Sequence, residues 1–210
     1  MFRGNLFVLS GPSGVGKDAI LERVLRIVPN LVKSISYTTR PKRPGEEDGK
    51  NYFFVNEEKF KEMIDKEEFL EWAVVHGYLY GTPKKMVEDY ISKGVDVILK
   101  IDVQGGINVK RIFSDAKLVF VLPPDFNELK RRLINRETED LQDLNIRLKN
   151  APLEISKISY YDYAVVNDNL DEAVDVVRCI IYAERHRLCK EKVEHFLRIF
   201  GGVKDEGSKY

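Results

Sequence analysis

Val8-Leu-Ser-Gly-Pro-Ser-Gly-Val-Gly-Lys-Asp18 carries an apolar run directly into a glycine-rich segment that ends in a lysine. Four residues separate Gly11 from Gly16-Lys17, which is the spacing of a phosphate-binding loop. Such a loop needs glycines because its backbone curls until consecutive N–H groups converge on one anion, and the following helix adds the positive end of its dipole. Residues 5–10 before the loop read as a buried strand, and residues 19–28 after it have apolar positions at helical spacing. This context favours a nucleoside triphosphate site over a plain glycine-rich turn.

The position after the lysine departs from the usual pattern. Ser or Thr normally stands there and its hydroxyl ligates magnesium, whereas this chain has Asp18. A carboxylate is also a good magnesium ligand, but it brings a negative charge close to the phosphates. We therefore expect Mg²⁺ as the cofactor and name Asp18 as a candidate metal ligand. The predicted ATP-binding residues are those of the loop: Gly11, Pro12, Ser13, Gly14, Val15, Gly16, Lys17 and Asp18.

The bulk composition narrows the class of protein. The 210 residues contain 34 Lys and Arg against 34 Asp and Glu, so no net field draws the chain to nucleic acid or to an anionic membrane. No segment resembles a signal peptide, and no apolar run approaches the roughly 18 residues of a membrane span. We expect a soluble, cytoplasmic protein without nucleic-acid or membrane partners. Cys179 and Cys189 stand in a charged helical segment and are predicted to be reduced thiols.

A second polar stretch lies between two short predicted strands at residues 34–55. Its proline- and glycine-punctuated loop places Arg40, Lys42 and Arg43 near the hydroxyls of Ser36 and Thr38, with Tyr52 following. Forked guanidinium groups and hydroxyls suit a dianionic phosphate. Taken alone the segment is a solvated basic loop, but its combination with a phosphate loop favours a second phosphate site.

The rest of the chain alternates strands and helices. Helices are predicted at 56–66, capped by Asn56, and from 83 to 92; a long final helix is expected to be capped by Asp171. Apolar strands are predicted at 67–75, 95–102, 118–122 and 163–166, and a polar helical segment at 127–159. This order indicates an α/β fold with a central, mostly parallel sheet. Glu71 and Asp102 stand on or after strands, where a carboxylate either reads a ligand or is simply exposed.

The specific signal is Thr38-Thr-Arg-Pro-Lys-Arg-Pro-Gly-Glu-Glu-Asp-Gly-Lys-Asn-Tyr-Phe-Phe-Val55, which resembles the signature of guanylate kinases nearly residue for residue. Leu79-Tyr-Gly-Thr82, Ile101-Asp-Val-Gln-Gly105, Arg136-Glu-Thr-Glu139 and Val166-Asn-Asp168 are similar to further landmarks of that family, in the same order. The resemblance covers residues 4–184, and residues 185–210 would be a helical extension and polar tail.

The resemblance implies a nucleoside-monophosphate kinase fold that transfers the terminal phosphate of ATP to GMP, and dGMP is a further acceptor to test. Within it, residues 34–85 would form a small GMP-binding subdomain and residues 127–159 a helical lid. The implied catalytic residues are Lys17, Arg43, Arg136 and Arg147. The implied GMP-binding residues are Ser36, Arg40, Arg43, Tyr52 and Tyr80 for the phosphate, and Glu71, Thr82 and Asp102 for guanine. The resemblance leaves the assembly open as a monomer or a homodimer.

One departure from the family concerns two charges together. Family members often carry an acid two residues before Asp102, where this chain has Lys100. Because residues 98, 100 and 102 share one face of a strand expected near the phosphate loop, we predict that Lys100 contacts Asp18. The alternative is that both are tolerated substitutions, bridged to metal or phosphate through water.

Three other functions compete with this interpretation. A kinase for a phosphorylated sugar would share the loop and core, but the Glu71, Thr82 and Asp102 set suits a base edge. Guanylate-kinase-like modules of scaffold proteins bind phosphorylated peptides, but they typically lose the loop lysine or the lid arginines, which are intact here. A GTP-binding switch is the weakest rival because its Asn-Lys-x-Asp motif is missing.

Overall fold

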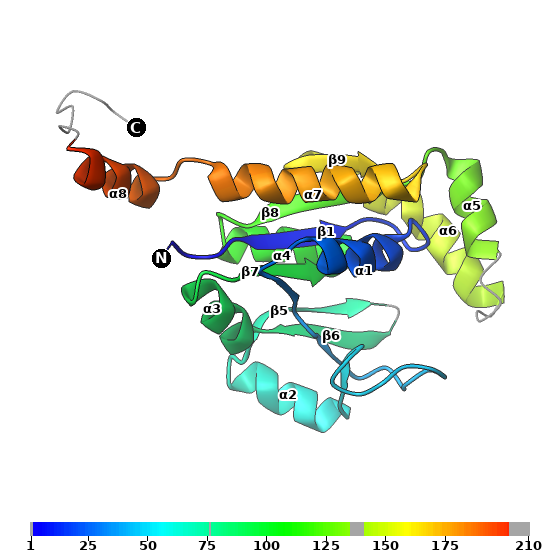
Figure 1. The fold of residues 1–210 in the computed structure, drawn as a ribbon. Coiled ribbons are helices and arrows are strands. Elements are labelled where there is room, and N and C mark those ends of the chain that lie inside the picture. The colour runs from blue at the N-terminus through cyan, green and yellow to red at the C-terminus, as the bar shows by residue number, and fades with distance from the viewer. Residues whose placement is uncertain (1, 76, 135–140, 202–210) are drawn as a thin grey trace.

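The computed structural model describes residues 2–75, 77–134 and 141–201. Its centre is a five-stranded sheet whose neighbouring strands all run parallel. In spatial order the strands are β2 (Leu31–Lys33), β7 (Asp96–Lys100), β1 (Leu6–Ser10), β8 (Lys117–Leu122) and β9 (Tyr163–Val166). Four of its strands, β1, β7, β8 and β9, are labelled in Figure 1. The predicted α/β fold with a parallel core is therefore confirmed.

Four of these strands follow apolar runs of the sequence, but β2 was not predicted. This edge strand has three residues and pairs only with β7, from Leu31 opposite Asp96 to Lys33 opposite Ile98. Only Leu31 is buried in it. A strand this short leaves no periodic pattern to recognise, so its place is fixed by the neighbouring strand.

Helices cover both faces of the central sheet because its strands alternate between two cores. Phe7, Leu9 and Ile98 pack with helices α1 (Lys17–Ile27) and α7 (Leu170–His186). Leu6, Val8 and Leu99 face the opposite way and pack with α3 (Lys84–Ser92) and α4 (Val103–Ile112). Burial of each such aliphatic or aromatic side chain contributes about 1.5–3 kcal/mol to the stability of the fold. Packing on both faces therefore holds the central sheet in place, together with the edge that carries the phosphate loop.

A second, smaller sheet lies beside the central one (Figure 1). Its strand order is β4 (Phe53–Phe54), β3 (Tyr37–Thr38), β6 (Tyr78–Pro83) and β5 (Phe69–Val75). β6 is antiparallel to both β3 and β5, while β3 and β4 are parallel. Helix α2 (Glu57–Asp65) packs Phe60 and Met63 against Phe69. Phe69, Leu70 and Glu71 of β5 are buried, while Trp72 and Val74 are exposed.

The two predicted helix caps had different outcomes. Asn56 caps α2, since its side-chain oxygen accepts a 2.8 Å hydrogen bond from the N–H of Lys59. The predicted cap of α7 was wrong: Asn169 accepts from the N–H of Asp171 at 2.8 Å, and Asp171 lies in the first helical turn. Asn and Asp are equally good helix caps. Asp171 still stabilises α7, because an acid in the first turn interacts favourably with the positive end of the helix dipole.

The predicted helical segment at 127–159 consists of α5 (Phe126–Ile134), α6 (Leu141–Ile155) and the short 3₁₀ turn Ile158–Tyr160. Arg136 lies outside the described residues. A separate helix, α8 (Lys190–Phe200), follows α7 in the segment where a helical extension was predicted. Cys179 and Cys189 are free thiols, as predicted. Across the described ranges, every helix is too short or too polar to cross a membrane.

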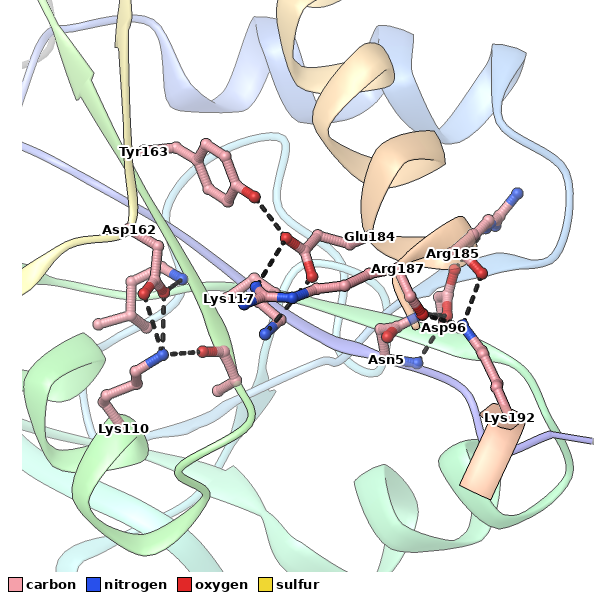
Figure 2. Close-up of polar contacts among 12 residues, drawn as sticks. Asn5, Asp96, Lys110, Lys117, Asp162, Tyr163, Glu184, Arg185, Arg187 and Lys192 are labelled. Carbon is pink, nitrogen blue, oxygen red and sulfur yellow. Dashed lines mark hydrogen bonds and ion pairs between the residues drawn. The ribbon is translucent and has the colours of Figure 1, made fainter. Parts of the chain in front are cut away.

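A polar network fastens α7 to the amino ends of the central strands, as Figure 2 shows. Asp96 is 2% exposed; it accepts from the backbone N–H of Asn5 at 2.6 Å and pairs with Arg185 at 2.6 Å. Glu184 accepts a hydrogen bond from the Tyr163 hydroxyl, which raises the pKa of Tyr163 to about 12. This network lies at the opposite end of the strands from the phosphate loop.

Candidate active site

A cavity of about 430 Å³ opens at the carboxyl edge of the central sheet and reaches the second sheet. Ligands of open α/β sheets bind at this edge. Predicted residues that line it are Gly11, Ser13, Lys17, Asp18, Ser36, Arg40, Arg43, Tyr52, Glu71, Tyr80, Asp102 and Arg147. A more open hollow of about 780 Å³ between α2 and α3 contains none of the predicted site residues. These twelve predicted residues therefore meet in one place, although their sequence positions are far apart. The predicted residues Pro12, Gly14, Val15, Gly16 and Thr82 do not line the cavity.

The phosphate loop connects β1 to α1 as predicted. The lysine ammonium of Lys17 folds back and donates to the carbonyl oxygens of Gly11 and Pro12. Gly16 has a φ of +91°, and an added methyl group there would lie 2.3 Å from the Asn167 side chain. Glycine is therefore required at this position by both backbone conformation and space.

Asn167 is a supporting residue whose role was not predicted. Its side-chain N–H donates a buried 2.7 Å hydrogen bond to the carbonyl oxygen of Val15, in the middle of the phosphate loop. It comes directly after β9 and is 5% exposed. A polar residue at the carboxyl end of a parallel strand was the available signal. This bond fixes the loop against the central sheet.

Asp18 and Lys100 form an ion pair across the cavity floor, which confirms the predicted contact. The Lys100 side chain is 15% exposed, whereas that of Asp18 is 67% exposed. Burial opposes the charged form of Lys100, but Tyr52 and Asp18 outweigh burial and raise the pKa of Lys100. Burial likewise opposes the charge of Asp18, and Lys100 lowers the pKa of that carboxyl group below its usual value. Both groups are therefore charged at neutral pH.

An arginine–tyrosine cluster forms the side of the cavity beneath the second sheet. Arg40 is 9% exposed, pairs with Glu46 at 2.6 Å and lies 5.6 Å from the centre of the Tyr52 ring. Tyr52 contacts Tyr80 edge to face at 5.8 Å. Glu46 also accepts from the backbone N–H of Arg43 at 2.8 Å, so this unpredicted acid orders the loop. The arrangement presents guanidinium and phenol groups to one anion.

Two carboxyl groups converge at the far end of the cavity. Glu71 is 6% exposed and accepts a 2.7 Å hydrogen bond from the hydroxyl of buried Thr82. A methyl group added at Gly105 would lie 2.9 Å from an oxygen of Asp102 and 3.0 Å from one of Glu71. Burial raises the pKa of Glu71 to about 7, and Asp102 adds to this rise. Asp102 is itself fixed in place because it caps α4 through the N–H groups of Gln104 and Gly105.

Helix α6 reaches the phosphate loop. The guanidinium of Arg147 donates a hydrogen bond to the Ser13 hydroxyl. Glu154, on the same helix, lines the cavity and was not predicted. Burial raises the pKa of Glu154, while Lys17 and Arg147 partly offset that effect. α6 therefore brings both a cation and an acid to the loop.

Comparison with known proteins gives one consistent result. The family model for guanylate kinase matches residues 3–184. A guanylate kinase of Thermotoga maritima is 47% identical over 92% of this chain and 95% of its own length. One from Caldanaerobacter subterraneus subsp. tengcongensis is 46% identical over 90% of this chain and 92% of its own length. The crystal structure of guanylate kinase from Anaplasma phagocytophilum superposes with a TM-score of 0.82 at 35% identity, covering 97% of this chain and 98% of that one.

The matched range coincides with the residues that resembled the family in sequence, and it includes every lining residue of the cavity. The structural match covers 97% of this chain and is therefore not confined to the central sheet. The chain belongs to the guanylate kinase family.

Proposed function

We propose that the cavity is the place where the terminal phosphate of ATP passes to GMP. The reaction is ATP + GMP = ADP + GDP, a phosphotransfer of purine nucleotide metabolism, and dGMP is a further acceptor to test. One observation carries this assignment of the site. The phosphate loop, the arginine–tyrosine cluster and the Glu71–Asp102 pair all open into the same 430 Å³ cavity. Two phosphate sites joined to a base-reading site are what a nucleoside monophosphate kinase requires.

On the donor side, residues 11–18 would hold the phosphates of ATP. The backbone N–H groups of a curled loop and the amino end of α1 attract anions. Lys17 already lies over the loop, bonded to its carbonyl oxygens. Bound phosphates are stronger acceptors, so the ammonium would transfer to them and follow the migrating phosphoryl group.

On the acceptor side, Ser36, Arg40, Arg43, Tyr52 and Tyr80 would hold the phosphate of GMP. These residues line one wall of the cavity. Guanidinium groups bind phosphate through paired N–H donors, and Arg40 is already oriented by Glu46 and Tyr52. Arg43 would orient the attacking phosphate oxygen, which is anionic and needs no strong general base.

Guanine would be read by Glu71 and Asp102. Its N1–H and N2–H₂ groups are donors that carboxylates accept, whereas adenine presents an N1 acceptor and would leave a carboxylate unpaired. One buried mismatch of this kind costs about 1–3 kcal/mol. The Thr82 hydroxyl donates to Glu71, so we assign Thr82 to orienting that carboxylate rather than to meeting guanine O6.

Catalysis would rest on positioning and charge neutralisation. Lys17, Arg43 and Arg147 line the cavity, and Arg136 would join them from the part of the lid outside the described residues. We assign residues 34–85 to a GMP-binding subdomain and residues 127–159 to the lid. Closure of the lid would exclude water, which would otherwise hydrolyse ATP.

We further propose Mg²⁺ as the metal that these enzymes use. Among the described residues, no three His, Cys, Asp or Glu side chains gather to hold a metal ion. That fits magnesium, which usually takes one or two carboxylates together with substrate phosphates. Asp18 is the suitable oxygen donor beside the phosphate loop and would hold the ion directly or through water. The bound ion would neutralise charge on the ATP phosphates.

The proposal is tested by ADP formation from ATP and magnesium with GMP, AMP, CMP or UMP as the acceptor. Turnover with GMP alone, lost in Lys17→Met, is the expected result. Equal turnover with a pyrimidine nucleotide, or none with any nucleotide, would contradict it and revive the sugar-phosphate kinase or phosphopeptide-binding alternatives. Sedimentation of the same sample would decide between a monomer and a homodimer.

A further inference from the structure

Lys100 lies at the boundary between the two halves of the cavity. It ends β7, lines the cavity, and its side chain is only 15% exposed. On one side its ammonium contacts Asp18 of the phosphate loop. On the other side the ammonium lies 5.8 Å from the centre of the Tyr52 ring, in the arginine–tyrosine cluster. A single ammonium group therefore contacts both the donor half and the acceptor half.

The surroundings of Lys100 carry more positive than negative charge. Lys33, on the neighbouring strand β2, lines the same cavity and comes near enough to Lys100 for the two ammonium groups to repel. Burial, and then Lys100, lower the pKa of Lys33, while Asp18 opposes them. The Lys33–Asp18–Lys100 cluster thus holds two ammonium groups around one carboxylate. Partly buried cations in excess are costly unless an anion joins them.

The ion pair with Asp18 does not by itself explain why Lys100 is buried. The Asp18 side chain is 67% exposed, so pairing with it does not require a lysine to be as deeply buried as Lys100 is. The ammonium instead turns inward beside Tyr52, a residue that we assign to the GMP phosphate. An ammonium has three donors, so it can serve Asp18 and a phosphate oxygen at once.

We propose that Lys100 binds the phosphate of GMP at the point where that phosphate faces the terminal phosphate of ATP, and that Asp18 holds Lys100 there when the site is empty. The inference rests on the proposed function. Reacting atoms must approach to about 3–3.5 Å, and two anionic phosphates repel at that range. A cation at the junction removes part of this repulsion. Lys100 would be a binding residue of the reaction at a position where family members often have an acid.

The test is calorimetric titration of GMP and of guanosine into the full chain, without ATP or metal. Lys100→Met should weaken GMP binding about tenfold or more, as expected for loss of a charge-assisted phosphate contact, and leave guanosine binding unchanged. Lys100→Arg should recover part of the GMP affinity. Lys59→Met, on the exposed face of α2, is the matched control and should bind both ligands as the wild type does.

Two results would overturn the inference alone. Either Lys100→Met binds GMP as tightly as the wild type, or it loses affinity for GMP and guanosine alike, which would assign Lys100 to the fold. In both cases the wild type would still bind and phosphorylate GMP, so the proposed function would stand. A wild type that fails to bind GMP would overturn the proposed function and the inference together.

Discussion

Thr82 and Glu71 face each other across the β5–β6 pair, and the threonine hydroxyl donates a 2.7 Å hydrogen bond to the glutamate carboxylate. Both side chains are buried, and burial raises the pKa of Glu71 to about 7. In the empty site this carboxyl group therefore exchanges its proton near neutral pH. Guanine donors would favour the charged form, since a carboxylate accepts them and a protonated acid accepts them less well.

The raised pKa of Glu71 predicts a pH dependence of the reaction. Below pH 7 the group is protonated in the free protein, so kcat/KM for GMP should rise as the pH increases from 6 to 8. The second ionisation of the GMP phosphate, near pH 6, contributes to the same rise. Glu71→Gln should lower kcat/KM about 10- to 100-fold and remove the part of the profile centred near pH 7. An unchanged profile in this variant would contradict the assignment. Trp72→Phe, on the exposed face of β5, is the control.

The raised pKa of Glu71 also predicts that stability falls as the pH rises, whereas activity increases. An acid whose pKa is raised on folding, here from 4.5 to about 7, binds more protons in the folded state between those values. Stability contributed by Glu71 therefore falls as the pH rises from 4.5 to 7, by at most about 3 kcal/mol. Urea unfolding measures the free energy of unfolding of Glu71→Gln relative to the wild type. This difference should favour the variant more at pH 8 than at pH 5. Glu68→Gln, which changes an exposed acid, should show no such difference.

Asn167 should act on ATP through the phosphate loop. Asn167→Ala leaves the Val15 carbonyl without its buried donor, which costs about 1–3 kcal/mol, and it should raise the KM for ATP more than the KM for GMP. Initial rates at varied ATP and GMP measure the two values. Asn169→Ala is a matched control because it removes only the cap of α7, at a cost of about 1 kcal/mol. Equal effects of both variants on the KM for ATP would contradict a role of Asn167 in holding the phosphate loop.

Arg147 is expected to act in the transition state. Its guanidinium already reaches Ser13 of the phosphate loop. Arg147→Met should lower kcat about 10²- to 10³-fold and leave the dissociation constant of GMP unchanged, because charge develops at the loop only during transfer. Rapid-quench kinetics measure the transfer step. Arg178→Met, which breaks an exposed ion pair on α7, should react at the wild-type rate. A parallel loss of GMP affinity in Arg147→Met would place the arginine in acceptor binding instead.

The polar network at the amino ends of the strands should affect stability alone. Asp96→Ala leaves Arg185 and the N–H of Asn5 without their buried partner and should cost about 3–5 kcal/mol in the free energy of unfolding. Asp175→Ala removes an exposed partner of Arg178 and should cost less than about 1 kcal/mol. Denaturant unfolding compares the two. The folded fraction of Asp96→Ala should keep the wild-type kcat, since the network lies away from the cavity, and a lowered kcat would contradict this separation.

Much of the fold was predictable because its signals are local. Buried parallel strands such as β1, β7 and β8 appear as apolar runs, and the phosphate loop combines glycine spacing with a strand and a helix. The edge strand β2 was missed because three residues have no period, and the cap of α7 was misplaced because Asn169 and Asp171 are both good caps. Helices and strands with one clear periodic face were predicted. The strand β2, whose place is fixed by its pairing with β7, was not.

The candidate site was predictable where charge chemistry points to a partner. The contact between Asp18 and Lys100 followed from strand alternation and opposite charge, and the structure confirms it. Supporting residues such as Glu46 and Asn167 were not predicted, because their roles depend on bonds to backbone groups that only the fold brings near. The roles of the individual side chains in binding and catalysis remain predictions.

A competition assay measures directly whether the protein selects GMP as the acceptor. Limiting ATP and magnesium are mixed with equimolar GMP, AMP, CMP and UMP, and all nucleotides are separated by chromatography. Loss of each acceptor then reports its relative kcat/KM. GMP should be consumed, GDP and ADP should appear in equal amounts, and the other three monophosphates should persist. Consumption of AMP at a rate similar to GMP, or ADP formation without GDP, would contradict the proposed function.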